Sequence, residues 1–336
     1  MQRIICCALI CVIFASAGWS LPAEWQRWVP DLTRQDDFYE FWGRSSYQSA
    51  LASIPPGAGT DPLATLTAGL RPVCHTELTE CASSNLMLPI LHLTDWWADD
   101  DYLGALEGKV TLHVTLLPSS MPGGGWIAEG PPDAATIPLR DAVLTARQAL
   151  RYLMSQPDVR TPRIGIIGEG LGGAVALALG ALEPDLISFI AIHEPVPGFH
   201  FRKRGIAADS SVVLQPVEQM AMAGQISHEQ LRYVLSYFDF FNFAPEVKSR
   251  TLVSMSLQDP VATTQQILAI YNHLGGPRQM VVQDTPGHLS VPDREHFYRK
   301  TYQWLEDLGW VRKPTVTTRN EHLAQRSAVQ RQLWSQ

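Results

Sequence analysis

Short apolar runs and segments of helical periodicity alternate along most of the chain. The runs are rich in Val, Ile, Leu and Met and have strand character. They cover residues 86–93, 110–117, 163–167, 186–193, 251–257 and 279–282. Other segments have apolar residues at intervals of three and four, which predicts helices, most clearly over 138–154. Further helices are expected over residues 36–51, 228–238, 261–274 and 293–308.

This alternation predicts the fold class. Apolar strands that alternate with helices are typical of an α/β protein, with a mostly parallel central sheet and helices on both faces. Residues 194–248 are expected to be an insertion between two strands. Pro314 ends the compact part, and the polar segment 314–336 is expected to be a helical surface tail. The pattern therefore predicts one domain over residues 18–313.

Residues 1–17 have the layout of a secretory signal peptide. Arg3 gives a short positive start, residues 4–15 form an apolar run, and Ala15-Ser16-Ala17 offers a cleavage site. A membrane anchor is the alternative, but the run is too short to span about 30 Å of hydrocarbon comfortably. We therefore expect cleavage before Gly18 and a secreted or periplasmic protein. No later stretch reaches about 18 uncharged apolar residues, so no membrane span is expected after cleavage.

Composition narrows the class of function. The chain has 336 residues, 46% of them hydrophobic and 18% charged, so it can bury a substantial core and is not a disordered protein. Its formal net charge of −7 argues against a nucleic-acid partner, because phosphate binding needs a basic surface. Cys74 and Cys81 are the cysteines left after signal removal, and we expect them to form a disulfide in an oxidising compartment. Since no histidines cluster near them, no metal site is predicted.

The segment 163–173, RIGIIGEGLGG, predicts a strand, a tight turn and the start of a helix. This segment matches two functional motifs. Gly168-x-Gly170-x-x-Gly173 fits the dinucleotide-binding fingerprint, with Glu194 after the next strand near the ribose position. Against this alternative, few strands remain after residue 194 to complete a Rossmann sheet, and nicotinamide cofactors are scarce outside the cell. We therefore expect no cofactor.

The second motif is the nucleophile elbow, small-x-nucleophile-x-small, which lifts a catalytic side chain above the sheet. Small residues are needed at both flanks because strand and helix nearly touch. Gly168 and Gly172 match these flanks, which puts Gly170 at the nucleophile position. Moving the register to make Glu169 the nucleophile would put large apolar residues at the small positions. The sequence therefore predicts an elbow that lacks its nucleophile.

Two residues further along the chain support the elbow interpretation. Asp259 follows one predicted strand and His288 follows the next. The chain order nucleophile, aspartate, histidine is that of α/β-hydrolases. In a working triad, Asp259 would orient His288, and His288 would take the proton of the nucleophile. Singly, each residue would be assigned to an ordinary loop, but the pair beside an elbow favours a triad.

With these motifs the chain resembles a known family, the acetyl xylan esterase/cephalosporin-C deacetylase family (carbohydrate esterase family seven). The resemblance covers most of the chain after the leader. It rests on DFYEFW at 37–42, on the region from Asp141 to Pro184, on YFDFFNFAPEVKSRTLVSMSLQDP and on AIYNHLGGPRQMVVQDTPGH. It implies an α/β-hydrolase fold, removal of acetyl groups from xylan-derived sugars, a serine triad and often a hexamer. The shorter middle region of this chain leaves its oligomeric state open.

The resemblance also assigns roles to single residues. The family's aspartate and histidine correspond to Asp259 and His288, and its serine falls on Gly170. The backbone N–H of Leu171 would be one oxyanion donor. The family's His-Gly-Tyr segment falls on residues 92–94, which places Thr94 at the second donor position. The triad is thus vestigial, and we expect a catalytically impaired or inactive homologue.

Two other hypotheses stay open. One is an active ester hydrolase or deacetylase with non-standard chemistry, and the other is the dinucleotide binder. For the leading hypothesis the expected ligand is a small-molecule or oligosaccharide ester. Among the 10 tryptophans, Trp96 and Trp97 follow a strand that ends near the predicted site and are candidates for stacking on a sugar.

Overall fold

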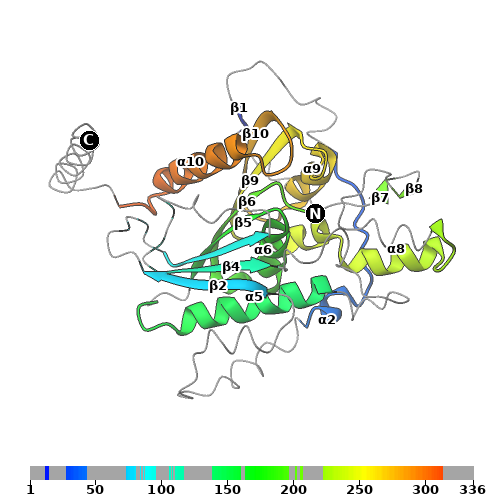
Figure 1. Ribbon diagram of the computed structural model, residues 1–336, viewed down its shortest axis with the longest axis horizontal. Coiled ribbons are helices and arrows are strands. Elements are labelled where there is room, and N and C mark those ends of the chain that lie inside the picture. The colour runs from blue at the N-terminus through cyan, green and yellow to red at the C-terminus, as the bar shows by residue number, and fades with distance from the viewer. Residues whose placement is uncertain are drawn as a thin grey trace, which may run out of the picture.

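A computed structural model of the chain describes residues 12–14, 28–43, 73–80, 84, 86, 88–95, 106, 108, 110–116, 138–159, 163–196, 201–202, 205–206 and 222–312. Its centre is an eight-stranded sheet with the strand order β1-β10-β9-β6-β5-β3-β4-β2 (Figure 1). The strands are β1 (Val12–Phe14), β2 (Val73–Glu80), β3 (Ile90–Asp95), β4 (Val110–Leu116), β5 (Ile164–Glu169), β6 (Ile187–His193), β9 (Arg250–Gln258) and β10 (Arg278–Pro286). All neighbouring strands pair in parallel except β2, which runs antiparallel to β4 at one edge.

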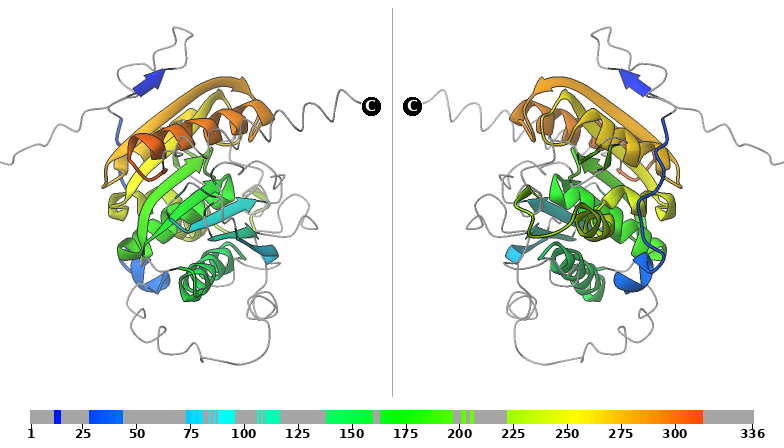
Figure 2. Two further views of the ribbon diagram at one scale, coloured as in Figure 1. Left: turned by 90° about the vertical axis from the view of Figure 1, so that its left-hand side faces the viewer. Right: turned by 90° about the vertical axis from the view of Figure 1, so that its right-hand side faces the viewer.

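Helices cover both faces of this sheet (Figure 2). Those that pack on it are α5 (Pro138–Ser155), α6 (Leu171–Leu182), α9 (Thr264–His273) and α10 (Val291–Asp307), and the other described α-helices are α2 (Phe38–Phe41) and α8 (His228–Tyr237). Side chains alternate between the faces along each strand. On β5, Ile166 therefore belongs to the core under α5, α6 and α9, and Ile167 belongs to the core under α10. The fold is the predicted α/β class, with a mostly parallel sheet between two helical layers.

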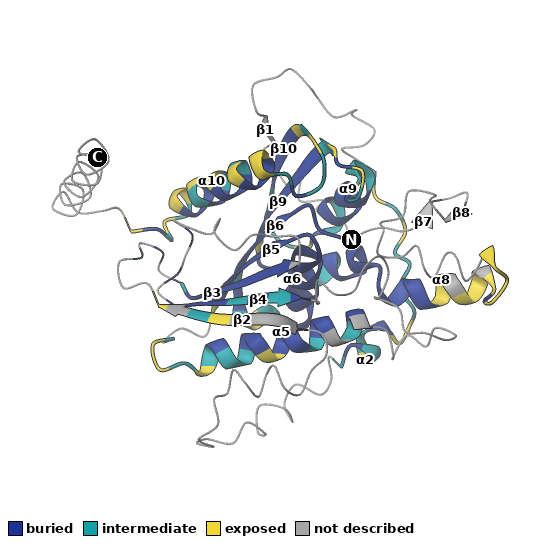
Figure 3. Ribbon diagram, in the orientation of Figure 1, coloured by how far each residue is buried: buried dark blue, intermediate teal, exposed yellow. Residues whose placement is uncertain are grey.

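Burial explains why α6 lies at the centre of the molecule. All its residues, LGGAVALALGAL, are buried, so its sequence has no polar face (Figure 3). Small side chains let it lie close to β3, β5 and β6. By contrast, α10 alternates buried and exposed positions, because one side of it packs on the sheet and the other faces water.

The predicted strands and most helices are present, with boundaries that differ by a few residues. The strand expected over 86–93 is shifted, because β3 covers Ile90–Asp95, and Leu86 makes two isolated bridges, with Gly108 and Val311, outside the strand. Strand β2 was not predicted, because VCHTELTE contains few apolar residues, and it lies at the edge of the sheet. Of the helix expected over 36–51, the described part is helical only at Phe38–Phe41, and residues 44–51 lie outside the description.

Several N-terminal and C-terminal predictions fall on segments that are not described. These are the cleavage site at 15–17, the region 18–27 and the tail 314–336. Within the predicted signal peptide, β1 pairs in parallel with β10. The side chain of Cys74 and all of Cys81 lie outside the description, so the disulfide stays a prediction. In the part of the chain that is described, no helix is long and apolar enough to cross a membrane.

Candidate active site

Gly170 forms the sharp turn between β5 and α6. Its backbone has φ 53° and ψ −118°, in the positive-φ region that glycine adopts with little strain. Its N–H donates to the carbonyl oxygen of His193 at 2.9 Å, and its own carbonyl oxygen accepts from the N–H of Val196 at 3.0 Å. These bonds tie the turn to the end of β6. The turn has the form of a nucleophile elbow, and the residue at its tip has no side chain.

The glycines that flank this turn are needed for its close packing. A Cβ added at Gly168 would lie 2.5 Å from the carbonyl oxygen of Gly172, and one added at Gly172 would lie 2.0 Å from the carbonyl oxygen of Leu93. Real Cβ atoms do not approach backbone so closely, so both positions need glycine. The same added atom at Gly172 would lie 2.9 Å from the backbone nitrogen of Thr94. The start of α6 therefore lies against the end of β3, where the second oxyanion donor was expected.

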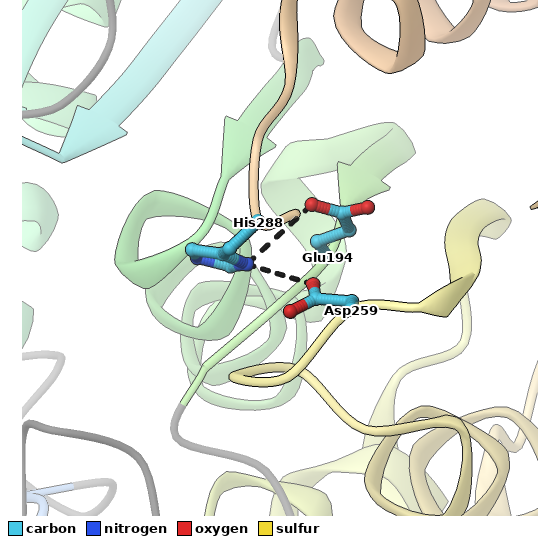
Figure 4. A group of neighbouring side chains, drawn as sticks. All are labelled: Glu194, Asp259 and His288. Carbon is cyan, nitrogen blue, oxygen red and sulfur yellow. Dashed lines mark hydrogen bonds and ion pairs between the residues drawn. The ribbon is translucent and has the colours of Figure 1, made fainter. Parts of the chain in front are cut away.

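Asp259 and His288 meet beyond the ends of β9 and β10. Asp259 Oδ2 lies 2.8 Å from His288 Nδ1 (Figure 4). The other carboxylate oxygen of Asp259 accepts the backbone N–H groups of Val261 and Ala262 at 2.7 and 3.0 Å, which fixes the carboxylate in its own loop. The strand order places the ends of β9 and β10 side by side, so two residues far apart in sequence form one pair.

A second carboxylate, that of Glu194, faces the same histidine. Glu194 follows β6, and its Oε2 lies 3.4 Å from His288 Nδ1 (Figure 4). The same oxygen accepts the backbone N–H of Leu289 at 2.5 Å. The sequence pattern predicted Glu194 only as a ribose contact of the dinucleotide alternative, and not as a partner of His288. Its position directly after a buried strand was a usable signal, but that β6 is the neighbour of β9 could not be read from the sequence.

Burial and charge together set the protonation of this group. Burial alone lowers the pKa of His288, but the hydrogen bonds and charges of Asp259 and Glu194 outweigh it and raise that pKa to about 10. Burial raises the pKa of Glu194 to about 7, against the opposing effect of its contact with His288. At neutral pH the imidazole ring is therefore charged. Its Nδ1 lies within ion-pair distance of Asp259 and of Glu194, which is about half ionised at that pH and becomes fully charged as the pH rises.

Residues 113–308, more than half of the chain, match the family model described as acetyl xylan esterase (AXE1). The chain belongs to the acetyl xylan esterase family. Two solved structures are similar along nearly their whole length. An acetyl xylan esterase from Paenibacillus sp. R4 has a TM-score of 0.60 and 21% identity, over 85% of this chain and 99% of that one.

The second structure is acetyl xylan esterase 1 from Thermoanaerobacterium sp. JW/SL YS485. It has a TM-score of 0.63 and 16% identity, over 86% of this chain and 99% of that one. At these identities the likeness shows the fold, which is that of the α/β-hydrolases.

The family's expected site residues are partly brought together in this structure. Gly170 and Leu171 lie at the elbow, Thr94 lies at the adjoining end of β3, and Asp259 bonds His288. Their roles in oxyanion binding and catalysis stay predictions. Thr94 directs its hydroxyl toward the Thr115 hydroxyl on β4, at 3.3 Å. Trp96 and Trp97 lie outside the described residues.

Glu169, the residue before the elbow tip, points away from this family's expected nucleophile position. Its carboxylate is fully buried and binds Arg294 of α10, with Oε2 2.6 Å from Nε, and it also accepts from the Tyr298 hydroxyl. The same hydroxyl lies 3.0 Å from Nε2 of His92. Glu169 therefore anchors α10 to the sheet, in agreement with the register that makes Gly170 the tip.

Glu194, Asp259 and His288 also form the group of described residues whose ligand atoms, all within 4.8 Å of one another, could hold a metal ion. The 2.8 Å separation between Nδ1 and Oδ2 is that of a charge-assisted N–H···O hydrogen bond. We therefore assign a proton to Nδ1. For the dinucleotide alternative, Glu194 would have to face a ribose, and its Oε2 instead accepts from Leu289. That alternative stays a prediction.

Proposed function

We propose that this chain is an exported, catalytically impaired or inactive member of the acetyl xylan esterase family. In this proposal it binds an ester-containing small molecule or oligosaccharide without turning it over efficiently. The observation that carries the proposal is Gly170, which occupies the tip of an otherwise complete elbow at φ 53° and ψ −118°. The apolar leader with its cleavage motif supports export.

The missing hydroxyl removes the covalent route of ester hydrolysis. A serine hydrolase forms an acyl-enzyme on its nucleophile, and glycine has no atom that can take the acyl group. Loss of the nucleophile typically costs about 10⁶-fold in turnover, and only about 10³–10⁴-fold over water remains where the oxyanion hole survives. The retained His288–Asp259 pair supports descent from an enzyme but does not replace the hydroxyl.

An ester hydrolase with non-standard chemistry is the competing proposal. The observation in its favour is the intact contact of His288 with Asp259, since a histidine oriented in this way would act as a general base on a water molecule. A general base must be neutral to accept a proton, and the pKa of His288 is raised to about 10. This route would therefore be slow at neutral pH and faster at alkaline pH.

Restoring the hydroxyl tests the proposal. We expect Gly170→Ser to hydrolyse 4-nitrophenyl acetate at pH 9 at least about a hundredfold faster than Gly170→Ala, because His288 can then act as a general base on a nucleophile. Gly170→Ala is the matched control, since both variants put a Cβ at a positive-φ position and differ only in the hydroxyl. Thermal unfolding of both variants checks that they fold equally well.

Turnover by the wild type, with and without His288, distinguishes the two proposals. Turnover by the wild type that is comparable to that of Gly170→Ser and survives His288→Ala would rule out a vestigial triad. Wild-type turnover that disappears in His288→Ala would instead support the competing proposal. Binding of acetylated xylo-oligosaccharides to the wild type, measured by calorimetry, tests the proposed ligand separately from turnover.

A further inference from the structure

Two carboxylates from different strands meet at one ring nitrogen of His288. Asp259 Oδ2 lies 2.8 Å from Nδ1, and Glu194 Oε2 lies 3.4 Å from it. Nδ1 carries one proton and donates a hydrogen bond to the closer oxygen, and the ionised form of the second carboxylate adds a negative charge within ion-pair distance. Since one carboxylate is enough to orient a catalytic imidazole, the second has a further role.

The second carboxylate also holds the backbone beside the histidine. Glu194 and Leu289 are the non-glycine residues of the described chain with positive φ, at 45° and 50°. They are joined by the bond from the Leu289 N–H to Glu194 Oε2 at 2.5 Å. Strained backbone of this kind persists only where the surroundings over-determine it, and it clusters at functional sites. The contact is therefore part of how the His288 loop is built.

We propose that Glu194 and Asp259 form a two-carboxylate seat that keeps His288 as an imidazolium, so that its Nε2–H donates to an acceptor oxygen of a bound ligand. Figure 4 shows the second ring nitrogen pointing away from both carboxylates. This inference rests on the function proposed above and specifies its chemistry. The ligand oxygen is that of an ester carbonyl or a carboxylate, and the histidine binds it rather than taking a proton from a nucleophile.

The other titratable groups around this loop do not compete for the role of the cation. His193 on β6 is fully buried, and its ring stacks on that of Phe297 with 4.9 Å between the ring centroids. Burial, together with the charge of His288, lowers the pKa of His193 well below the usual value. Arg294 on α10 is ion-paired with Glu169. Asp293 on α10 is buried, which raises its pKa. His288 is thus the cation that the two carboxylates share.

The division of contacts explains why both carboxylates are present. Asp259 uses one oxygen for the ring and one for its own turn. Glu194 uses one oxygen for both the ring and the Leu289 N–H, and its other oxygen has no hydrogen-bond partner within the described residues. Asp259 therefore orients the imidazole, and Glu194 supplies the second charge and positions the backbone. Glu194 is a positioning residue in this scheme.

Nuclear magnetic resonance of ¹⁵N-histidine-labelled protein tests the seat directly. In the wild type we expect the His288 ring to stay protonated up to a pH of about 10. Glu194→Gln should lower the His288 pKa by at least about one unit, because it removes a charge while its amide oxygen can still accept the Leu289 N–H. Asp259→Asn should lower it as well, and the double variant should lower it further.

Glu306→Gln, which removes an exposed carboxylate on α10, is the matched control and should leave the His288 pKa unchanged. If Glu194→Gln shifts that pKa no more than Glu306→Gln does, the seat is refuted. Adding Zn²⁺ to the labelled protein tests whether the three side chains bind a metal ion instead. A zinc-induced change in the Nδ1 resonance that disappears in Glu194→Gln would show that the three side chains bind a cation and do not share a proton. That result would overturn the proposal.

Two probes test the ligand and distinguish its source. Sodium acetate represents a carboxylate and methyl acetate an ester carbonyl. We expect at least one of them to shift the Nε2 resonance at pH 7 and to lose this effect above the pKa of His288. No shift from either probe would overturn the donor role. A shift from acetate alone or from methyl acetate alone identifies which oxygen the site accepts.

These measurements do not depend on activity, so they separate this inference from the proposed function. If Gly170→Ser stays inactive while the resonance results are as expected, the proposal that the missing hydroxyl of Gly170 accounts for the lost activity fails and the seat stands. If Gly170→Ser is active, Glu194→Gln in that background should shift the alkaline rise of its rate–pH profile to lower pH. An unshifted profile would count against the seat even where the esterase proposal holds.

Discussion

Gly172 shows how tightly single residues constrain the elbow. It lies at the start of α6, where a Cβ would come within 2.0 Å of the Leu93 carbonyl oxygen. The neighbouring atoms are backbone of a central strand and cannot move aside cheaply. This explains why the spacing of Gly168 and Gly172 in the sequence was enough to locate the elbow, since the steric requirement is local.

Gly172→Ala should therefore destabilise the protein by about 3 kcal/mol or more, because overpacking against fixed backbone forces strand and helix apart. Urea unfolding gives the free energy. Gly224→Ala is the control, because a Cβ there meets nothing within 4 Å and only its φ of +72° is unfavourable. It should cost about 1 kcal/mol. Equal losses in the two variants would contradict the steric explanation.

The role of Glu194, in contrast, could not be predicted from local sequence. Its contact with Leu289 joins residues that are 95 positions apart in the sequence, and His288 is the residue before Leu289. They exist because β6, β9 and β10 are neighbours in the sheet. The sequence predicts the strands and the residues that follow them, but the order of the strands depends on the whole fold. The pairing of Asp259 with His288 was accessible only through the recurring chain order of hydrolases.

At the scale of elements, α10 is the helix that ties the His288 loop to the elbow strand. Arg294 and Tyr298, one helical turn apart, both bind Glu169 of β5. The sequence predicted this helix over 293–308 but not its ion pair, because Glu169 has no sequence signal for its partner. Helix boundaries and the edge strand β2 were likewise less predictable than the buried strands, whose apolar runs are unambiguous.

Breaking this pair from one side should be costly. Arg294→Met leaves the Glu169 carboxylate buried without its cation and should lower the free energy of unfolding by about 3–5 kcal/mol. The double variant Glu169→Gln/Arg294→Met should lose less than the sum of the two single variants, measured in urea as a double-mutant cycle. Arg299→Met changes an exposed arginine on the same helix and should cost little. Strict additivity of Glu169→Gln and Arg294→Met would show that the pair is not coupled.

At the scale of the whole molecule, the sequence predicted the layers correctly. Fully apolar strands imply a sheet that is covered twice, and the structure has helices on both faces with two separate cores. What remained open was the protonation balance of the buried site, which depends on groups from three strand ends. That balance has a consequence for the stability of the entire fold.

Stability should decrease as pH rises from neutral to about 10. The folded-state pKa of His288 is raised to about 10, so the stabilisation by its charge is complete below the unfolded value and is lost as pH rises through 10. The pKa of Glu194 is raised to about 7, so its contribution also falls with rising pH, between its unfolded value and about 7. Each linked proton accounts for at most about 1.4 kcal/mol per pH unit.

Urea unfolding at a series of pH values measures this slope. His288→Gln removes the titrating ring and should have a shallower decrease between neutral pH and pH 10 than the wild type. Parallel curves for the two proteins would contradict a charged His288 in the folded state.

The complete burial of α6 has a further consequence for motion. A helix without a solvent-facing side cannot tilt or slide unless the layers on every side of it move as well. The elbow at its N-terminus is therefore a rigid wall of the site. Within the described residues, any closure around a ligand is left to the loops after β9 and β10, which carry Asp259 and His288, while the elbow itself stays still.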